Sequence, residues 1–308
     1  MPKDYVVGID LGGTKSALAL LDENNQIVAR ARIATEADEG PDNIIGRLLE
    51  EIETFKAGLA ADVRLAAVGV CAPGPLDHEQ GIMLSPTNMP RFHNTPLKTI
   101  LEERLGVPAR LEHDAKAAAL GELYAGEGQG FNSLVYIVIG TGVGAAIILN
   151  GDLYRGEKNF AGEIGHATLD RYGEPCHCGS RGCFETFMSG PSLTKRYARL
   201  CPDVGQISGA AITERAKHGD EAALQIIHEA GEALGVMVAT TAMMLDIERF
   251  IVGGSVAKAG DLLINSARTT IPKYSFKSFS SRISLVSTKL GEDAAILGAA
   301  HLARQALS

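Results

Sequence analysis

Residues 163–185 hold most of the metal-binding side chains of this chain. Three of its five cysteines, Cys176, Cys178 and Cys183, lie within eight residues, and His166 lies ten residues before the first of them. One histidine and three thiolates complete the tetrahedral shell of a structural zinc site. A shell filled by protein ligands leaves no open position for metal-bound water, which disfavours the alternative of a zinc-dependent hydrolase. The spacing therefore predicts a structural Zn²⁺ ion.

An Asp-Leu-Gly-Gly-Thr-Lys segment that begins at Asp10 has residue types suited to phosphate and magnesium. The paired glycines Gly12 and Gly13 let backbone N–H groups approach a phosphate closely. Thr14 and Lys15 can add donors, and a carboxylate at the end of a strand is well placed to hold a hydrated Mg²⁺. Glycine pairs also occur in turns for conformational reasons alone, and this turn does not open a helix as a Walker A loop does.

Two further glycine segments follow. The Gly-Thr-Gly-Val-Gly segment at residues 140–144, with Thr141 and Gly142 at its centre, resembles the first turn and is a candidate for a second phosphate contact. Gly253 and Gly254 follow a predicted strand and suit a contact with an adenine or ribose. In this order the three segments indicate an ATP site of the actin-like ATPase type.

Asp114 ends a Leu-Glu-His-Asp segment and precedes an alanine-rich helix pattern. A carboxylate at that junction can act as a base toward a substrate hydroxyl. It can also cap the helix, and the residues alone favour capping.

Composition limits the classes of partner. The net charge is −8 at pH 7, and there is no cluster of Lys and Arg of the kind that neutralises nucleic-acid phosphates. No apolar run is long enough to span a bilayer, and the N-terminus does not read as a signal peptide. An odd number of cysteines, three of them close together, suits metal binding in a reducing compartment. We therefore expect a cytoplasmic protein without a nucleic-acid or membrane partner, with Cys71 and Cys201 as buried apolar residues.

The motifs require an α/β scaffold. Turn residues between alternating apolar runs predict strands, and apolar residues at helical spacing predict helices. The predicted strands are residues 5–10, 16–21, 26–33, 65–70, 249–252 and an edge strand at 282–287, and the predicted helices are 41–59, 219–245, 258–270 and 294–306. From residue 134 the order of strand, glycine turn, strand, polar turn and strand repeats, which indicates two related halves facing each other across a cleft.

In this order, the Asp-Leu-Gly-Gly-Thr-Lys turn, the Gly-Thr-Gly-Val-Gly turn, Glu-Ile-Gly-His and Cys-His-Cys-Gly-Ser-Arg-Gly-Cys-Phe-Glu resemble the ROK family of sugar kinases and repressors. The similarity covers essentially the whole chain. It implies an actin-like (ribonuclease H-like) fold of two α/β domains, with ATP and Mg²⁺ in the cleft. We place the small domain at residues 1–114 with a closing helix at 293–308, and the large zinc-containing domain at 115–292. The resemblance also suggests a homodimer.

The resemblance assigns roles residue by residue. It makes Asp114 the base that takes the proton of the sugar hydroxyl. It makes Glu163, His166 and Glu185 ligands of the sugar hydroxyls, together with Asn88 and the loop around Gly74. One nitrogen of His166 would bind zinc while the other donates to the sugar. The alternative is a histidine that only binds the metal and holds a backbone carbonyl with its other nitrogen.

Two positions depart from the family pattern. His113 stands before Asp114 where the family usually has asparagine, so a bulkier, titratable imidazole replaces an amide beside the sugar. His177 stands between the first two zinc cysteines where the family usually has glycine. The first change bears directly on the choice of substrate.

These features predict an ATP-dependent hexose kinase. Glucose is the first candidate, because Glu163, His166 and Glu185 offer several hydroxyl partners and nothing in the sequence marks an acetyl pocket. N-acetylmannosamine, N-acetylglucosamine and fructose are the alternative substrates. A sugar-sensing regulator is the non-enzyme alternative, although the first strand is expected to begin about four residues in, which leaves no room for a helix-turn-helix.

Overall fold

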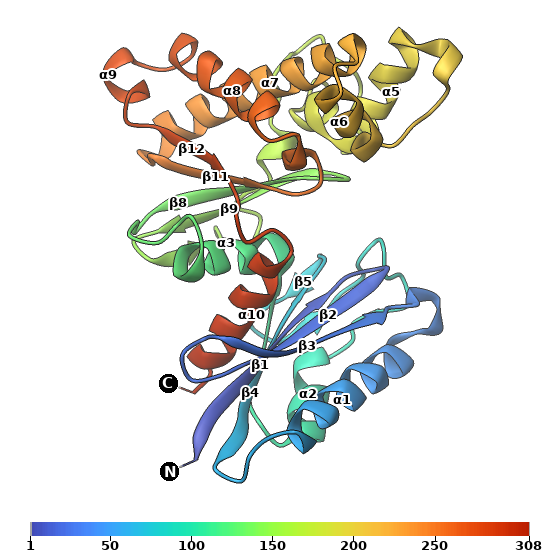
Figure 1. Cartoon of the computed structure of the whole chain (residues 1–308), viewed down its shortest axis with the longest axis vertical. Coiled ribbons are helices and arrows are strands. Elements are labelled where there is room, and N and C mark those ends of the chain that lie inside the picture. The colour runs from blue at the N-terminus through green and yellow to red at the C-terminus, as the bar shows by residue number, and fades with distance from the viewer. Residues whose placement is uncertain (1, 308) are drawn as a thin grey trace. The chain divides into compact units, whose positions relative to one another are not determined.

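The computed structural model describes residues 2–307. It divides into two compact units: the first runs to Gly126 and resumes at Glu292, and the second is Glu127–Gly291. Each is an α/β unit built on a five-stranded sheet. Figure 1 shows the chain coloured along its length, with the closing helix among the N-terminal elements.

The sheet of the first unit begins with an antiparallel meander. Its strands are β1 (Lys3–Leu11), β2 (Lys15–Leu21), β3 (Ile27–Ala34), β4 (Val63–Ala72) and β7 (Ala109–His113), in the order β3-β2-β1-β4-β7. β4 and β7 run parallel to β1, so the carboxyl ends of three strands lie at one edge of the sheet. The predicted strands are confirmed, and β4 is longer than expected at both ends.

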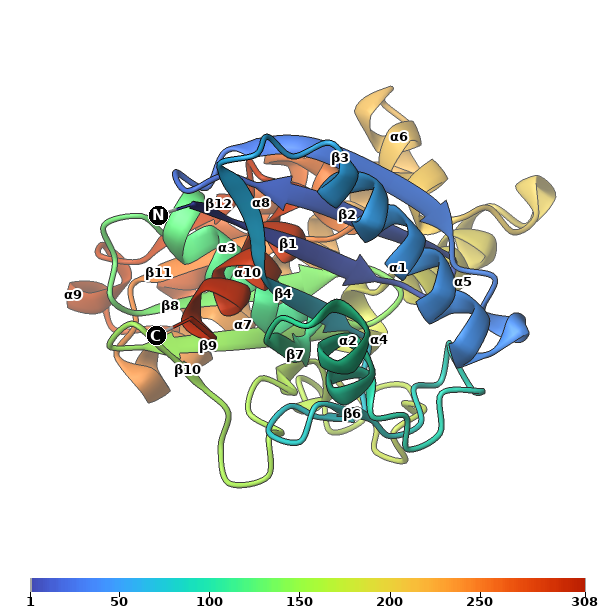
Figure 2. The same ribbon diagram turned by 90° about the horizontal axis from the view of Figure 1, so that it is seen from below.

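Helices cover both faces of this sheet. α1 (Pro41–Ala57) and α2 (Leu97–Leu105) bury their apolar stripes against Val7, Ile9 and Leu18. α10 (Asp293–Gln305) packs on the opposite face, where it lies across β1 and β4 (Figure 2). The alternation of β1 between the two apolar clusters explains why both of its faces are buried. A small hairpin, β5 (Leu76–Asp77) and β6 (Ile82–Met83), and the 3₁₀ turn η1 (Ala37–Glu39) complete the unit.

α3 (Asp114–Ala125) belongs to the first unit because it packs tightly on α10. A Cβ on Gly298 would lie 1.7 Å from the carbonyl oxygen of Ala117, so the two backbones touch at this crossing. The sequence predicts a domain boundary after Asp114, whereas the two compact units divide after Gly126. The close contact between the helices, which alanine and glycine content alone does not reveal, decides the difference.

The second unit repeats the plan of the first. Its strands are β8 (Leu134–Ile139), β9 (Val143–Leu149), β10 (Asp152–Tyr154), β11 (Arg249–Gly253) and β12 (Ser284–Ser287), in the order β10-β9-β8-β11-β12. Three antiparallel strands are again followed by two that run parallel to the first. This confirms the internal repeat expected from the sequence and the edge position of β12.

The helices of the second unit pack on one large apolar cluster. They are α4 (Glu185–Met188), α5 (Gly190–Leu200), α6 (Gly209–Lys217), α7 (Glu221–Leu245), α8 (Asp261–Thr270) and α9 (Lys277–Ser280), with 3₁₀ turns η2 (Ile164–His166), η3 (Pro202–Val204), η4 (Val256–Ala259) and η5 (Ile271–Lys273). The helix predicted at 258–270 begins only at Asp261. Gly260, at φ +61°, separates it from η4, because that left-handed conformation ends the preceding turn.

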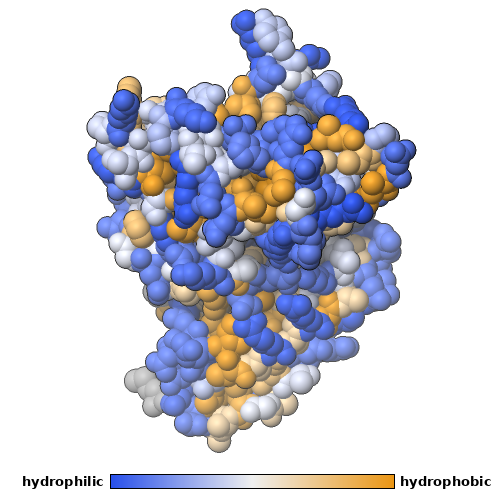
Figure 3. All heavy atoms as spheres, turned by 45° about the horizontal axis from the view of Figure 1, so that its top comes forward, coloured by the Kyte–Doolittle hydropathy of each residue, from blue (hydrophilic) through white to orange (hydrophobic). Residues whose placement is uncertain are grey.

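The surface is mixed in character. On the face drawn in Figure 3, hydrophilic side chains surround smaller hydrophobic patches. Within residues 2–307 no helix combines the length and apolar character needed to cross a membrane.

Candidate functional site

Four residues lie at the carboxyl edge of the first sheet: Asp10, Cys71, His113 and Asp114. Asp10 on β1 is in register with Cys71 on β4, and Ala72, the next residue of β4, is in register with His113 on β7. Asp114 follows at the first position of α3. Ligands of parallel sheets bind beyond the carboxyl ends of the strands, so this edge is the natural place for a site.

Asp10 is the most perturbed carboxyl group at this edge. Burial and the nearby charge of Asp114 raise the pKa of Asp10 to about 6. The buried thiol of Cys71 donates to Asp10 Oδ1 over 3.6 Å, and burial raises the pKa of that thiol well above its usual value. The charge of Asp114 opposes the ionisation of the half-buried Asp10, an arrangement that a cation relieves.

The first glycine turn lies directly after Asp10. A Cβ on Gly13 would lie 2.9 Å from the backbone oxygen of Asn88, so the turn and the exposed Asn88 are in contact. Thr14 and Lys15 are exposed. The Lys15 ammonium pairs with Glu292 at 2.9 Å, a partner that the sequence did not suggest. Both side chains are more than half exposed, so this pair is weak and Lys15 is accessible to an anion.

Asp114 does not cap α3. The helix begins at Asp114 itself, and the N-cap is His113, which makes no side-chain capping bond. The Asp114 carboxylate instead accepts from the backbone N–H of Ala115 at 2.6 Å and lies 2.9 Å from Nδ1 of His113. The capping role that the residues alone favoured is therefore wrong, because the helix begins at Asp114, one residue earlier than a cap at this position requires.

The other glycine segments meet in the second unit. The turn after β8, with the exposed Thr141 and Gly142, lies at the strand end that faces the end of β11. A Cβ on Gly254 would lie 2.4 Å from the carbonyl oxygen of Ile139, and one on Gly253 would overlap the hydroxyl of Tyr136. Their contact with β8 brings Gly253 and Gly254 to the same edge as the second turn.

The segment that carries Glu163 and His166 packs along β9. A Cβ on Gly165 would lie 1.9 Å from the carbonyl oxygen of Val143, so only glycine fits at this position, which lies between Glu163 and His166 in the chain. Glu163 precedes the 3₁₀ turn η2 and is exposed, whereas His166 is half-buried at its end. The close approach places both residues beside the second glycine turn.

Glu185 is buried and doubly engaged. Its Oε2 accepts from the backbone N–H of Val143 at 2.9 Å, and its Oε1 lies 3.0 Å from Nδ1 of His177. The imidazole of His177 also meets that of His166 edge to face, with ring centroids 5.3 Å apart. Thus the histidine that departs from the family pattern contacts two of the residues expected to bind the sugar.

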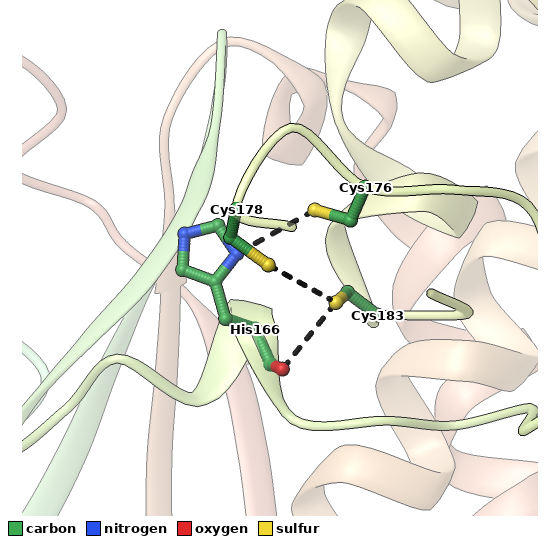
Figure 4. A group of neighbouring side chains, drawn as sticks. All are labelled: His166, Cys176, Cys178 and Cys183. Atoms are coloured by element: carbon green, nitrogen blue, oxygen red, sulfur yellow. Dashed lines mark hydrogen bonds between the residues drawn. The ribbon is translucent and has the colours of Figure 1, made fainter. Parts of the chain in front are cut away.

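The predicted zinc ligands form one cluster (Figure 4). His166, Cys176, Cys178 and Cys183 each offer one ligand atom, and these atoms all lie within 4.8 Å of one another. His166 Nδ1 is 3.7 Å from Cys176 Sγ, and Cys178 Sγ is 3.7 Å from Cys183 Sγ. The other ring nitrogen of His166 points away from the three sulfur atoms.

These separations match the edges of a zinc tetrahedron. Bonds of about 2.3 Å to sulfur and about 2.0 Å to nitrogen give S–S edges near 3.8 Å and N–S edges near 3.6 Å. Burial raises the pKa of Cys183 to about 12, whereas hydrogen bonding from the Ser180 backbone lowers that of Cys178. A metal ion would hold Cys183 as the thiolate at neutral pH, because binding displaces the proton. The donor set and its geometry fit Zn²⁺.

The structure thus gathers the expected residues into two groups, one in each unit. The first group contains Asp10, Gly12, Gly13, Thr14, Lys15, Gly74, Asn88, His113 and Asp114, and the second contains Thr141, Gly142, Glu163, His166, Cys176, Cys178, Cys183, Glu185, Gly253 and Gly254. Sequence reasoning missed the contacts of Cys71 with Asp10 and of Val143 with Glu185. For the contact of Cys71 with Asp10, the sequence offers only a cysteine at the end of a predicted strand. Val143 contacts Glu185 through its backbone N–H, which leaves no signal in the sequence.

Comparison with known proteins points to one family. The sequence model of the ROK family matches residues 6–306. A glucokinase from Thermotoga maritima is 32% identical over 99% of both chains. A ROK family glucokinase from Streptomyces griseus, solved in complex with glucose and AMPPNP, is 32% identical, with a TM-score of 0.81 over 98% of this chain and 99% of that one. A xylose repressor from Caldicellulosiruptor bescii is 28% identical over 95% of this chain and 76% of its own length. The predicted actin-like fold is confirmed.

Proposed function

The chain belongs to the ROK family, and from this premise we propose that it is an ATP-dependent sugar kinase that phosphorylates glucose. The assignment as a sugar kinase rests on glucokinase relatives that match over nearly their whole length at 30% to 32% identity. The observation that carries the mechanism is the pairing of Asp10 and Asp114 at one edge of the first sheet. Phosphoryl transfer needs a held cation and a positioned nucleophile, and these carboxylates supply one group for each.

Asp114 takes the proton of the sugar hydroxyl as the hydroxyl oxygen bonds to the terminal phosphorus of ATP and the bond to the ADP oxygen breaks. Asp10 holds Mg²⁺, which when bound neutralises charge on the phosphates of ATP. The raised pKa of Asp10 supports this role, because a half-buried carboxylate beside a second negative charge is stabilised in its ionised form by a cation. Gly12 and Gly13 present backbone N–H groups to the phosphates.

In the second unit, Thr141, Gly142, Gly253 and Gly254 are proposed to contact ATP. Glu163, His166 and Glu185 are proposed to bind sugar hydroxyls, joined from the first unit by Asn88, His113 and the loop at Gly74. The hydrogen bond from Val143 to Glu185 supports this division, since it links a sugar ligand to the glycine turn beside it. Glucose is favoured because these residues offer several hydroxyl partners and nothing in the sequence marks an acetyl pocket.

Zinc is proposed as a structural cofactor held by His166, Cys176, Cys178 and Cys183. All four positions would be filled by protein atoms, so the ion supplies no bound water for catalysis. It fixes the loop that carries His166 and Glu185. The second nitrogen of His166 points away from the sulfur atoms, which supports its use for the sugar.

A coupled assay of ADP release tests the function. Glucose, N-acetylmannosamine, N-acetylglucosamine and fructose are offered with Mg-ATP, and Asp114→Asn serves as the matched control. We expect sugar-dependent turnover, highest with glucose, and almost none in the variant. Highest turnover with another of these sugars would replace glucose as the substrate, and no turnover with any of them would overturn the kinase proposal.

A sugar-sensing regulator is the second candidate, favoured by the 28% identity to the xylose repressor. That protein is longer, since the match covers 76% of it. A gel-shift experiment with sugar-responsive operator DNA separates the two candidates, because retarded DNA without ADP release supports the regulator. We also expect a homodimer, which sedimentation would show as twice the mass of the chain.

A further inference from the structure

We propose that His113 is a positioning residue that holds one oxygen of the Asp114 carboxylate and leaves the other to receive the proton of the sugar hydroxyl. This inference rests on the proposed kinase function. It assigns His113 a role toward the base itself, in addition to its place beside the sugar.

Two contacts of the Asp114 carboxylate, one hydrogen bond and one ion-pair contact, fall on the same oxygen. Oδ1 accepts from the backbone N–H of Ala115 at 2.6 Å and lies 2.9 Å from Nδ1 of His113. Within residues 2–307, Oδ2 has no such partner. The backbone donor and the imidazole nitrogen on the same oxygen restrict the carboxylate and leave Oδ2 as the basic atom.

The imidazole is itself held in place. A Cβ on Gly74 would lie 2.9 Å from Cδ2 and 3.1 Å from Nε2 of His113, so the ring rests against the backbone that follows β4. His113 is the last residue of β7, where its backbone is extended at φ −68° and ψ 141°. Strand geometry on one side and a glycine contact on the other limit the rotation of the ring.

The contact also sets the tautomer. An ionised carboxylate has no hydrogen to give, so Nδ1 of His113 must carry one. In the neutral ring Nε2 is then an acceptor, whereas the amide of an asparagine would offer both donors and an acceptor. During transfer the sugar O–H bond breaks and its proton moves to Oδ2. The sugar oxygen bonds to the terminal phosphorus of ATP as the bond from that phosphorus to the ADP oxygen breaks, and the Nδ1–H stays in place.

The charge on His113 modulates the base. The charged groups that face it are Asp114 and Lys116 from α3 and Glu112 from β7, while the loop after β4 contributes the uncharged Gly74. Burial lowers the pKa of His113, but the hydrogen bond and charge of Asp114 raise it more, so the net pKa lies above its usual value. The imidazolium present below that pKa places a positive charge beside the carboxylate that receives the proton, and deprotonation of His113 at higher pH removes this charge.

Steady-state kinetics against pH test the proposal. His113→Leu removes the donor at similar volume, and we expect kcat to fall about tenfold or more while KM for ATP stays the same. His113→Asn restores a donor, so it should recover most of that loss yet lack the rise of kcat with pH above about 6.5 that we expect of the wild type. His218→Asn, at an exposed histidine of the second unit, is the control and should behave as wild type.

Two results would overturn the proposal: full kcat in His113→Leu, or an unaltered pH profile in His113→Asn. A measurement without turnover separates this failure from that of the kinase function. The NMR titration of His113, identified among the eight histidines by the signal missing from His113→Asn, should shift to lower pH in Asp114→Asn. If the His113 titration does not shift, the coupling of His113 to Asp114 is rejected, even if the protein phosphorylates glucose. If the titration shifts, the coupling is supported, even if the protein phosphorylates no sugar.

Discussion

The carboxylate of Glu185 accepts a hydrogen bond of 2.9 Å from the backbone N–H of Val143. Glu185 is the first residue of α4 and follows the last zinc-ligand candidate, Cys183, by two positions, whereas Val143 opens β9 after the second glycine turn. The metal loop and the glycine turn of the second unit are therefore joined by a buried, charge-assisted contact. A substitution in the metal loop should therefore alter the geometry of the glycine turn, and the reverse.

Replacing His177 with glycine, the usual residue of the family, should weaken sugar binding. The change removes the contact of 3.0 Å to Oε1 of Glu185 and leaves the hydrogen bond from Val143 to Oε2. The His177 side chain is 74% exposed, so we expect KM for glucose to rise by no more than about fivefold. Zinc content should not change, since His177 is not one of the four ligands. An unchanged KM would show that Val143 alone positions Glu185.

Asp114→Asn should lower kcat by about 10² to 10⁴, the range that a positioned general base contributes. The amide preserves the shape of the side chain, and Oδ1 can still accept from Ala115. Glucose affinity, measured by calorimetry, should therefore change only a few-fold. Turnover close to wild type would remove Asp114 from the role of base.

Removing zinc should destabilise the second unit and loosen the sugar site. Cys176→Ser takes away a buried ligand next to His166, and we expect lower zinc content, a lower Tm and a higher KM for glucose. Cys201→Ser, at a half-buried cysteine outside the cluster, is the matched control. Elemental analysis, thermal melts and kinetics check the three effects. Wild-type Tm and KM in zinc-free protein would contradict a structural role for the metal.

Asp10→Asn should stabilise the metal-free protein at high pH. Burial raises the pKa of Asp10 from 3.8 to about 6, so the protonated form is favoured in the fold. Its contribution to stability is fully present below pH 3.8 and is lost as pH rises through about 6. Above pH 7 the variant should gain up to about 3 kcal/mol in free energy of unfolding, and almost nothing at pH 3.5. Urea denaturation at the two pH values measures the gain in free energy of unfolding. Equal gains at both values would show that ionisation of Asp10 does not destabilise the fold.

His301→Phe should make the first unit more resistant to acid. Burial, with the nearby charge of Arg304, lowers the pKa of His301 from 6.5 to about 4, and its Nε2 is buried without a hydrogen-bond partner among the described residues. The neutral ring stabilises the fold above pH 6.5, and this contribution is lost as pH falls toward 4.

Phenylalanine keeps the stacking on Tyr124, at 3.6 Å between ring centroids, beside a small hollow lined by Leu21 and Leu297. Thermal melts of the His301→Phe variant from pH 8 to pH 4 should show a gain of about 1 kcal/mol at pH 8 that grows as pH falls. A gain that does not depend on pH would mean that packing, and not the buried nitrogen, limits stability.

Much of this structure could be predicted from local patterns in the sequence. The alternation of apolar residues along β1 and β2 and the helical spacing in α1 and α7 follow from backbone geometry, which repeats over a few residues. The zinc ligands are close together in the chain, so their spacing alone predicted a cluster that the fold then closes to within 4.8 Å.

Tertiary structure decided what depends on distant groups. Asp10 and Asp114 are 104 positions apart, and only the parallel register of three strands brings them to one edge. The rotamers that set His113 on Asp114 and His177 on Glu185 have no sequence signature, because side-chain contacts depend on the shape of the surrounding packing. The raised pKa of Asp10 has the same origin: its residue type determined that it could carry a charge, and burial in the fold decided what that charge costs.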